Sequence, residues 1–247
     1  MKMRHVIRQM LKRFGLDVRI LQPFSDDYEN LVFISEAIHS NVVLDVGANK
    51  GTFAADLFRA GYSGSVVSFE PLPDAYQQLV ARASSNARWI VAPMIALGES
   101  ERIANFHVAG NGSSSSLLEM ENLHVDVAPQ SRVVSSIPVH VKRLDVVAPE
   151  LIGDADNIFL KIDTQGYEDA VIDGATGILD RVVAIRTEIS FRPLYKGQKL
   201  FEEMISKITV MGFELWEITP VLRDLRTGQM LQCDATFVRL PKNKPSA

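Results

Sequence analysis

Apolar and polar residues follow two different periods along the chain. Short apolar runs, typical of strands buried on both faces, occur at residues 41–46, 65–70, 88–95, 157–162 and 181–187. Between them, apolar residues recur every three or four positions, which predicts helices at 52–60, 73–84, 168–179 and 201–211. Strands that alternate with helical crossovers indicate a parallel sheet with helices on both faces.

Two regions depart from this alternation. Residues 98–147 contain glycines, four serines at 113–116 and short alternating stretches, and we expect an irregular insertion with little helix. Such an insertion either selects the substrate or is a solvated loop. The segments 213–218 and 234–240 predict an antiparallel hairpin that closes the sheet. The fold class predicted is α/β, with a doubly wound, mostly parallel seven-stranded sheet.

The first forty residues predict a helical extension ahead of a domain at 41–240, and residues 241–247 predict a disordered tail. A helix at 26–40 is capped by Ser25 or Asp26. An earlier helix carries an apolar stripe made of Met3, Val6, Ile7, Met10, Leu11 and Phe14. Basic residues stand beside this stripe, namely Lys2, Arg4, Arg8, Lys12, Arg13 and Arg19. This helix either contacts an anionic membrane or, as the simpler interpretation, packs on the sheet or forms a subunit contact in a homo-oligomer.

The composition narrows the function classes. The chain has 247 residues and a net charge of -4 with both signs interspersed, which does not favour nucleic acid as a partner. Cys233 is the only cysteine, so neither a disulfide framework nor a thiolate zinc site is expected. No apolar run approaches the length of a membrane span, and the chain starts without a signal-peptide pattern. We therefore expect a soluble, cytoplasmic protein.

The most informative polar motif is the turn that follows the first strand. The strand ends with Asp45, and Gly47 and Gly51 then let the backbone pass close under a ligand. Glu70 ends the next strand, where an acid can accept two hydrogen bonds from ribose hydroxyls. The pattern indicates a ligand with a ribose. The alternative is a tight turn between a buried strand and a helix.

What the turn lacks limits which nucleoside ligand it can bind. Asn49 and Thr52 occupy the second and third glycine positions of the dinucleotide fingerprint G-x-G-x-x-G. Lys50 precedes Gly51 instead of following it, so the phosphate-binding P-loop does not fit either. A nicotinamide-dependent oxidoreductase therefore remains only the rival enzyme class. A non-catalytic cofactor-binding module that docks a partner or a membrane is the non-enzymatic alternative.

Four acids lie at the predicted carboxyl ends of strands, namely Asp45, Glu70, Asp163 and Glu188. Ligands of open parallel sheets bind outside this edge, so the four acids are expected to converge on one crevice. An unpaired buried acid would be costly, which indicates contact with a ligand, a cation or a neighbouring donor.

Several motifs, in this order, resemble those of the FkbM methyltransferases. They are VLDVGANKG at 43–51, SFEP at 68–71, ALG at 96–98, LD at 144–145, LKIDTQGYE at 160–168, DGA at 173–175 and DATFVR at 234–239. The resemblance covers about residues 41–240. It implies a Rossmann-like domain that uses S-adenosyl-L-methionine to methylate oxygen in sugars, polyketide-like metabolites or glycolipids. The acceptor implied is a small-molecule or lipid-linked glycan.

The resemblance also implies roles for individual residues. Gly47 and Gly51 would meet the amino-acid part of the cofactor, Asp45 would order the turn or reach the amine through water, and Glu70 would hold the ribose. Ile95 and Ala96 would border the adenine, although plain sheet core is as good an interpretation. The cofactor set expected from these positions is Asp45, Gly47, Asn49, Gly51, Glu70, Pro71, Ile95, Ala96 and Asp163.

Methyl transfer from a sulfonium needs alignment and the removal of one proton. The candidate bases are Asp163, Glu188 and, third, His107, although a lone histidine in an alternating strand is more often a surface residue. Asp163 has no adjacent second acid, so no metal is expected there. For the acceptor, Ser114, Ser115 and Tyr195 are the candidate contacts, by hydrogen bonding and by stacking on a sugar face, and wall packing is the alternative for Tyr195.

Overall fold

The computed structural model of the protein describes Met10 and residues 26–240. The basic N-terminal helix, apart from Met10, and the disordered tail at 241–247 were predicted for segments outside these residues, and both stay predictions. The domain boundaries at 40 and 240 stay predictions as well. Within the described part of the chain, no helix has the length and apolar character needed to cross a membrane.

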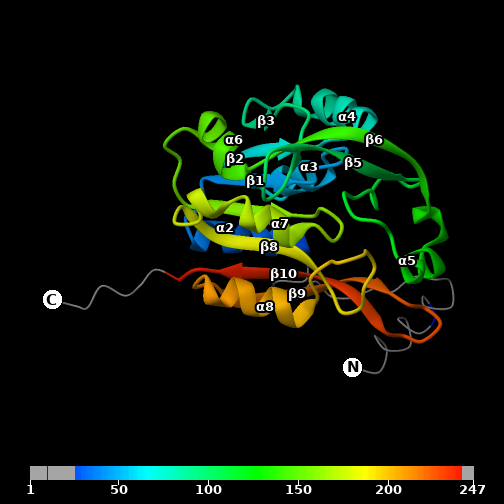
Figure 1. The fold of residues 1–247 in the computed structure, drawn as a ribbon. Helices are drawn as coiled ribbons and strands as arrows, with labels where there is room; N and C mark the ends of the chain where they lie inside the picture. Colours follow the sequence, from blue (N-terminus) through cyan, green and yellow to red (C-terminus); the bar gives the residue numbers. More distant parts are fainter. Residues whose placement is uncertain (1–9, 11–25, 241–247) are drawn as a thin grey trace.

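One seven-stranded sheet forms the centre of the molecule, in the order β3-β2-β1-β7-β8-β10-β9 (Figure 1). The first five strands of that order are parallel, whereas β10 is antiparallel to both β8 and β9. This confirms the predicted Rossmann-like α/β class with its terminal hairpin. The strands are β1 (Val42–Val46), β2 (Ser65–Phe69), β3 (Trp89–Val91), β7 (Ile158–Ile162), β8 (Val182–Ser190), β9 (Glu214–Arg223) and β10 (Met230–Val238).

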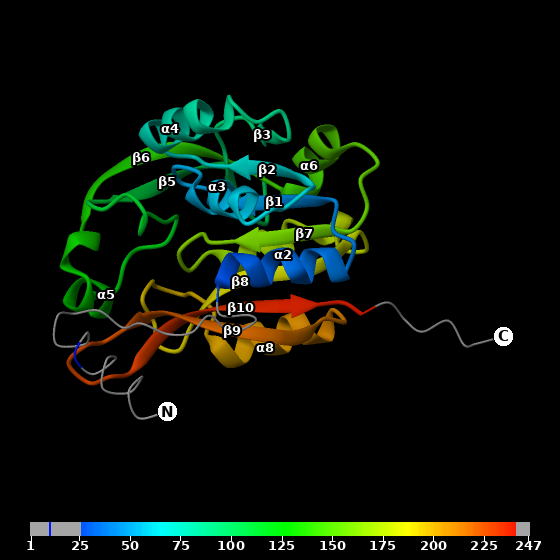
Figure 2. The same cartoon turned by 180° about the vertical axis from the view of Figure 1, so that it is seen from behind.

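Helices cover both faces of this sheet. The apolar cores assign α2, α3 and α4 to one face and α6, α7 and α8 to the other. Figure 2 shows α2 and α3 in front of the sheet, whereas Figure 1 shows α6 and α7 on the opposite face. The helices are α2 (Asp27–Ala37), α3 (Thr52–Arg59), α4 (Pro73–Ala83), α6 (Leu144–Ile152), α7 (Glu168–Asp173) and α8 (Phe201–Val210).

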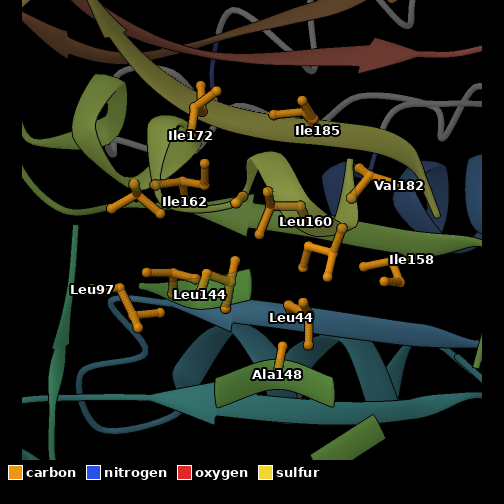
Figure 3. Packing of buried hydrophobic residues seen from close by; sticks show 14 of the residues in the cluster. Leu44, Leu97, Leu144, Ala148, Ile158, Leu160, Ile162, Ile172, Val182 and Ile185 are labelled. Atoms are coloured by element: carbon orange, nitrogen blue, oxygen red, sulfur yellow. The ribbon is translucent and has the colours of Figure 1, made fainter. Parts of the chain in front are cut away.

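The two central strands, β1 and β7, are buried along their whole length, which explains their unbroken apolar runs. Alternate side chains point to opposite faces. Leu44 and Leu160 pack toward Leu144 and Ala148 of α6 (Figure 3). The chain leaves β1 for β2 and β3 on one side and returns to β7 on the other, so the order of strands reverses between β1 and β7. Ligands of this fold class bind at that reversal.

The expectation of an irregular insertion at 98–147 was wrong. A second sheet, in the order β4-β6-β5, occupies much of it, and α6 begins within it. Val139 and Val141 alternate with exposed residues and pack against Leu72 and Ala75, so the segment has a buried face of its own. The added elements are β4 (Ala96–Leu97), β5 (Arg102–Ala109), α5 (Asn122–Val127) and β6 (Val133–Lys142).

Candidate cofactor and active site

A pocket of about 470 Å³ opens at the carboxyl ends of β1, β2 and β7, where the strand order reverses. The turn after β1, the end of β2 and the segment after β7 all contribute to its wall. Part of the second sheet and the segment around Gly112 line it as well. Its volume lies in the range of small-molecule and cofactor sites.

The two glycines of the turn have different tasks. Gly47 has φ 75°, and a Cβ on it would lie 1.9 Å from the carbonyl oxygen of Asp163, so the segment after β7 requires a glycine there. Gly51 has φ 76° and begins α3, and a Cβ on it would meet Leu79 and Trp89. Gly47 lines the pocket, whereas Gly51 lies outside its lining. Gly51 therefore serves helix entry and packing.

Every backbone N–H of the turn already donates to a protein oxygen. Loops that bind phosphate leave such groups free for the ligand, so this turn suits a ligand without phosphate. The donors and acceptors are Gly47 and Ala48 to the Phe69 carbonyl, Asn49 to Glu70 Oε2, Lys50 to Asn49 Oδ1, and Gly51 to the Ala48 carbonyl.

Glu70 holds the turn in place and also lies on the pocket wall. Its Oε2 accepts from the Asn49 N–H at 2.7 Å and its Oε1 accepts from the Leu72 N–H at 2.8 Å, so it fastens the turn to the start of α4. It also lines the pocket while being 4% exposed. Each carboxylate oxygen keeps a second lone pair for a ribose hydroxyl. Burial outweighs the two N–H donors and raises the pKa of Glu70 to about 7.

The raised pKa makes stability depend on pH. In the unfolded chain Glu70 titrates near 4.5, so its protonated form stabilises the fold below that pH, and this contribution is lost as the pH rises to about 7. We expect the free energy of unfolding to fall more steeply from pH 5 to 8 in the wild type than in Glu70→Gln, by up to about 3 kcal/mol. Urea titrations at several pH values check this.

His124 has the opposite effect in both proteins, because burial lowers its pKa to about 4 and its contribution to stability grows as the pH rises. The difference between wild type and Glu70→Gln removes this common slope. Equal slopes in the two proteins would contradict the prediction.

An apolar wall adjoins Glu70. Ile95 and Ala96 line the pocket as expected, and so does Pro71. The wall is completed by Leu97 and by Phe106 of β5, neither of which the sequence analysis named as a site residue. Apolar side chains of this kind suit the faces of a planar base.

A buried lysine connects the turn after β1 to a buried acid. Lys161 Nζ lies 3.0 Å from Asp45 Oδ1 and donates to the Gly47 carbonyl at 3.3 Å. Asp45 is fully buried, accepts from Ser68 Oγ at 3.0 Å and lies outside the pocket lining. Burial lowers the pKa of Lys161, but Asp45 and Asp163 outweigh it, so the pKa is raised and the ammonium is retained. Asp45 is therefore connected to the turn through Lys161, which contacts both Asp45 and the Gly47 carbonyl.

One glutamine joins two of the candidate bases. Gln165 Nε2 donates to Asp163 Oδ1 at 2.8 Å and to Glu188 Oε2 at 2.9 Å. Glu188 also accepts from Gln232, is 7% exposed and lies outside the pocket lining. Burial and the charge of Asp163 raise the pKa of Glu188 well above its usual range. The Asp163 side chain is 42% exposed and lines the pocket, so of these two acids Asp163 is the one that can reach a ligand.

Other predicted residues lie apart from the pocket. His107 is on β5, where its backbone pairs with Ser136 and bridges to Ser116, and it does not line the pocket. Tyr195 is fully buried and donates to the Ser114 carbonyl, so it cannot stack on a sugar.

The two serines expected at the acceptor differ in position. Ser115 lines the pocket and Ser114 does not. The Oγ of Ser115 donates to the Gly112 carbonyl at 2.8 Å, so this hydroxyl helps to shape the pocket wall.

The sequence reasoning also missed a polar end of the pocket, formed by Asp27, Tyr28, Arg186 and Asp234. A charged residue inside an apolar strand, as at Arg186, was a usable signal. Gln165 lies between Asp163 and Glu168 in the motif LKIDTQGYE, and this position was the signal that could have identified it. Among the described residues, no group of three or more His, Cys, Asp or Glu side chains is arranged to hold a metal ion.

Comparisons with known proteins place the chain among methyltransferases. The 2-O-methyltransferase NoeI of Sinorhizobium fredii is 27% identical over 207 residues, covering 78% of this chain and 80% of that protein. The fibrillarin of Methanococcus jannaschii matches with a TM-score of 0.47 and 10% identity, covering 82% of this chain and 68% of that one. A TehB-like methyltransferase from Corynebacterium glutamicum matches with a TM-score of 0.40 and 14% identity over 97% of both chains. These two structural matches are too distant to bear on activity.

The family comparison is more extensive. The model of the methyltransferase FkbM domain matches residues 45–215, which is more than half of the chain. This range contains the glycine turn, Glu70, Asp163 and Glu188. The protein therefore belongs to the FkbM methyltransferase family, as its motifs predicted.

Proposed function

We propose that this S-adenosylmethionine-dependent methyltransferase methylates oxygen, at a hydroxyl of a sugar, glycolipid or glycosylated metabolite. The observation that carries the proposal is that Glu70 and Asp163 line one pocket, the first suited to a ribose and the second able to take a proton. The relative NoeI is named a 2-O-methyltransferase, which supports oxygen as the atom methylated.

The residues present fit the cofactor. S-adenosylmethionine has a ribose and an adenine but no phosphate, in agreement with the accepting oxygens of Glu70, the apolar wall at Ile95 and Ala96, and the fully engaged N–H groups of the turn. When bound, the cofactor supplies a methyl group that its sulfonium has already activated.

The chain itself has to align the acceptor and remove its proton. Gln165 donates to Oδ1 of Asp163, and Lys161 Nζ lies 3.7 Å from Oδ2. These contacts hold the carboxylate in one orientation and leave it lone pairs for a ligand in the pocket that it lines. An alcohol loses its proton late in methyl transfer, so a carboxylate within hydrogen-bond reach is a sufficient base. Asp163 is therefore the proposed base.

Calorimetry with S-adenosylhomocysteine tests the ribose contact. Glu70→Ala removes both proposed ribose acceptors and the hydrogen bonds from the Asn49 and Leu72 N–H groups, and we expect binding to weaken by about ten- to a hundredfold, as for the loss of a charged hydrogen bond. The exposed acid Glu150 supplies the control, because Glu150→Ala should leave the affinity unchanged. A wild type that does not bind, or a Glu70→Ala variant with wild-type affinity, would contradict the proposal.

Membership of the FkbM methyltransferase family argues against the nicotinamide-dependent oxidoreductase, which the sequence left as a rival enzyme class. The non-catalytic docking module remains a rival, and transfer of a labelled methyl group to any acceptor would exclude it. Four further expectations remain proposals. The acceptor is a small-molecule or lipid-linked glycan and not a nucleic acid, and the basic N-terminal segment contacts a membrane. The protein forms a homo-oligomer and is located in the cytoplasm.

A further inference from the structure

Besides Asp163, the pocket is lined by a group of polar residues that have no role in the proposed reaction. The group consists of Asp27 and Tyr28 of α2, Arg186 of β8 and Asp234 of β10. Figure 2 shows α2 lying across the sheet in front of β7 and β8. This acceptor end, defined by Asp27, Tyr28, Asp163, Arg186 and Asp234, lies on the same pocket as the cofactor residues.

Arg186 at the acceptor end and the neighbouring Lys161 already have protein partners. Arg186 is 3% exposed, and its guanidinium donates to Asp27 Oδ2 at 2.7 Å, Asp234 Oδ2 at 3.0 Å and Thr236 Oγ1 at 3.1 Å. Lys161 is directed to Asp45 and the Gly47 carbonyl. Neither cation therefore presents a free charge to a ligand.

The carboxylates are the accessible charges. The side chains of Asp27, Asp163 and Asp234 are 34%, 42% and 30% exposed, respectively. A carboxylate has about four lone-pair sites, and the protein partners of these three occupy only some of them. With buried Asp45 included, four carboxylates stand against two cations, so this end of the pocket is negative and accepts hydrogen bonds.

An aromatic pair forms one side of this end. The rings of Tyr28 and Phe53 lie 5.9 Å apart, and both residues line the pocket. Their apolar surface beside carboxylate oxygens matches a sugar ring, which carries C–H groups on its faces and hydroxyl donors at its edge. A carboxylate, phosphate or sulfate would instead meet three like charges, and among the described residues the exposed Lys50, on the turn after β1, is the one cation of the pocket wall outside these ion pairs.

We infer that the sugar unit methylated by this protein is uncharged or an amino sugar, and that uronic acids and phosphorylated or sulfated sugars are excluded from the acceptor end. The inference rests on the proposed function and adds the charge class of its substrate. The negative acceptor end selects units that donate hydrogen bonds, through hydroxyl or ammonium groups.

A labelling experiment tests the inference directly. The protein is incubated with methyl-labelled S-adenosylmethionine and an extract of the cells that encode it, the labelled product is hydrolysed, and its monosaccharides are separated by charge. We expect the label on a neutral or amino sugar. Label on an acidic sugar, or on a molecule without sugar, would overturn the inference while methyl transfer stands. Absence of any labelled product would overturn the proposed function itself.

A variant separates acceptor binding from cofactor binding. Asp234→Asn keeps the shape of the side chain but removes one charge, and we expect about a tenfold higher KM for the labelled acceptor with an unchanged Kd for S-adenosylhomocysteine. Asp154→Asn, an exposed acid near the amino end of β7 and the opposite edge of the sheet, should change neither constant. If Asp234→Asn weakens cofactor binding as much as it raises KM, the acceptor end serves the cofactor and the inference fails.

Discussion

Replacing Gly47 with alanine is expected to abolish detectable binding of S-adenosylhomocysteine and to lower the melting temperature. The new Cβ would lie 1.9 Å from the carbonyl oxygen of Asp163, far inside any real contact distance. Either the turn or the segment after β7 must move, and both line the pocket. The φ of 75° adds a cost of roughly 1–2 kcal/mol for a residue with a Cβ. Calorimetry and thermal unfolding measure the two effects.

Gly212 provides the matched control for this variant. Its φ is 87°, and a Cβ on it would meet nothing within 4 Å, so Gly212→Ala has backbone strain without an overlap. It should lower the melting temperature modestly and leave the affinity for S-adenosylhomocysteine unchanged. If Gly47→Ala behaves like Gly212→Ala, the approach of Asp163 to the turn does not decide the shape of the pocket.

Lys161→Met is expected to destabilise the protein by about 3–5 kcal/mol, because it leaves a buried charge without its partner. Asp45 is fully buried and its Oδ1 lies 3.0 Å from Lys161 Nζ. The substitution also removes the donor to the Gly47 carbonyl, so the affinity for the cofactor should fall with stability. Denaturant unfolding and calorimetry measure the two losses.

A double-mutant cycle with Asp45→Asn identifies the cause. If the ion pair is responsible, the double variant should be markedly more stable than the sum of the two single losses predicts. Additive losses would mean that Lys161 stabilises the fold through other contacts, such as that of its ammonium with the Phe53 ring, 5.2 Å from the ring centroid, rather than through the ion pair with Asp45.

Much of the architecture was predictable because local patterns reflect it. The apolar runs of β1 and β7 follow from burial on both faces, and the helices between strands follow from their own periodicity. Glu70 and Asp163 were predicted to share a crevice because parallel strands end at the same edge of a sheet, and both line the pocket. The second sheet was missed because its alternating residues, such as Val139 and Val141, follow two serines and stand beside Pro138, which interrupt the strand pattern.

The sequence by itself determined the α/β class, the family, and the turn and strand-end acid of the cofactor site, because each depends on neighbours within a few positions. Only the tertiary structure decided which charged groups reach a ligand. Arg186 and Asp27 are 159 positions apart, and the packing of α2 on the sheet brings them together. Tertiary packing also buries Glu188, which accepts a hydrogen bond from Gln165, and leaves the Asp163 side chain accessible from the pocket. Solvent access and charge partners depend on contacts between distant segments, which no local sequence pattern records.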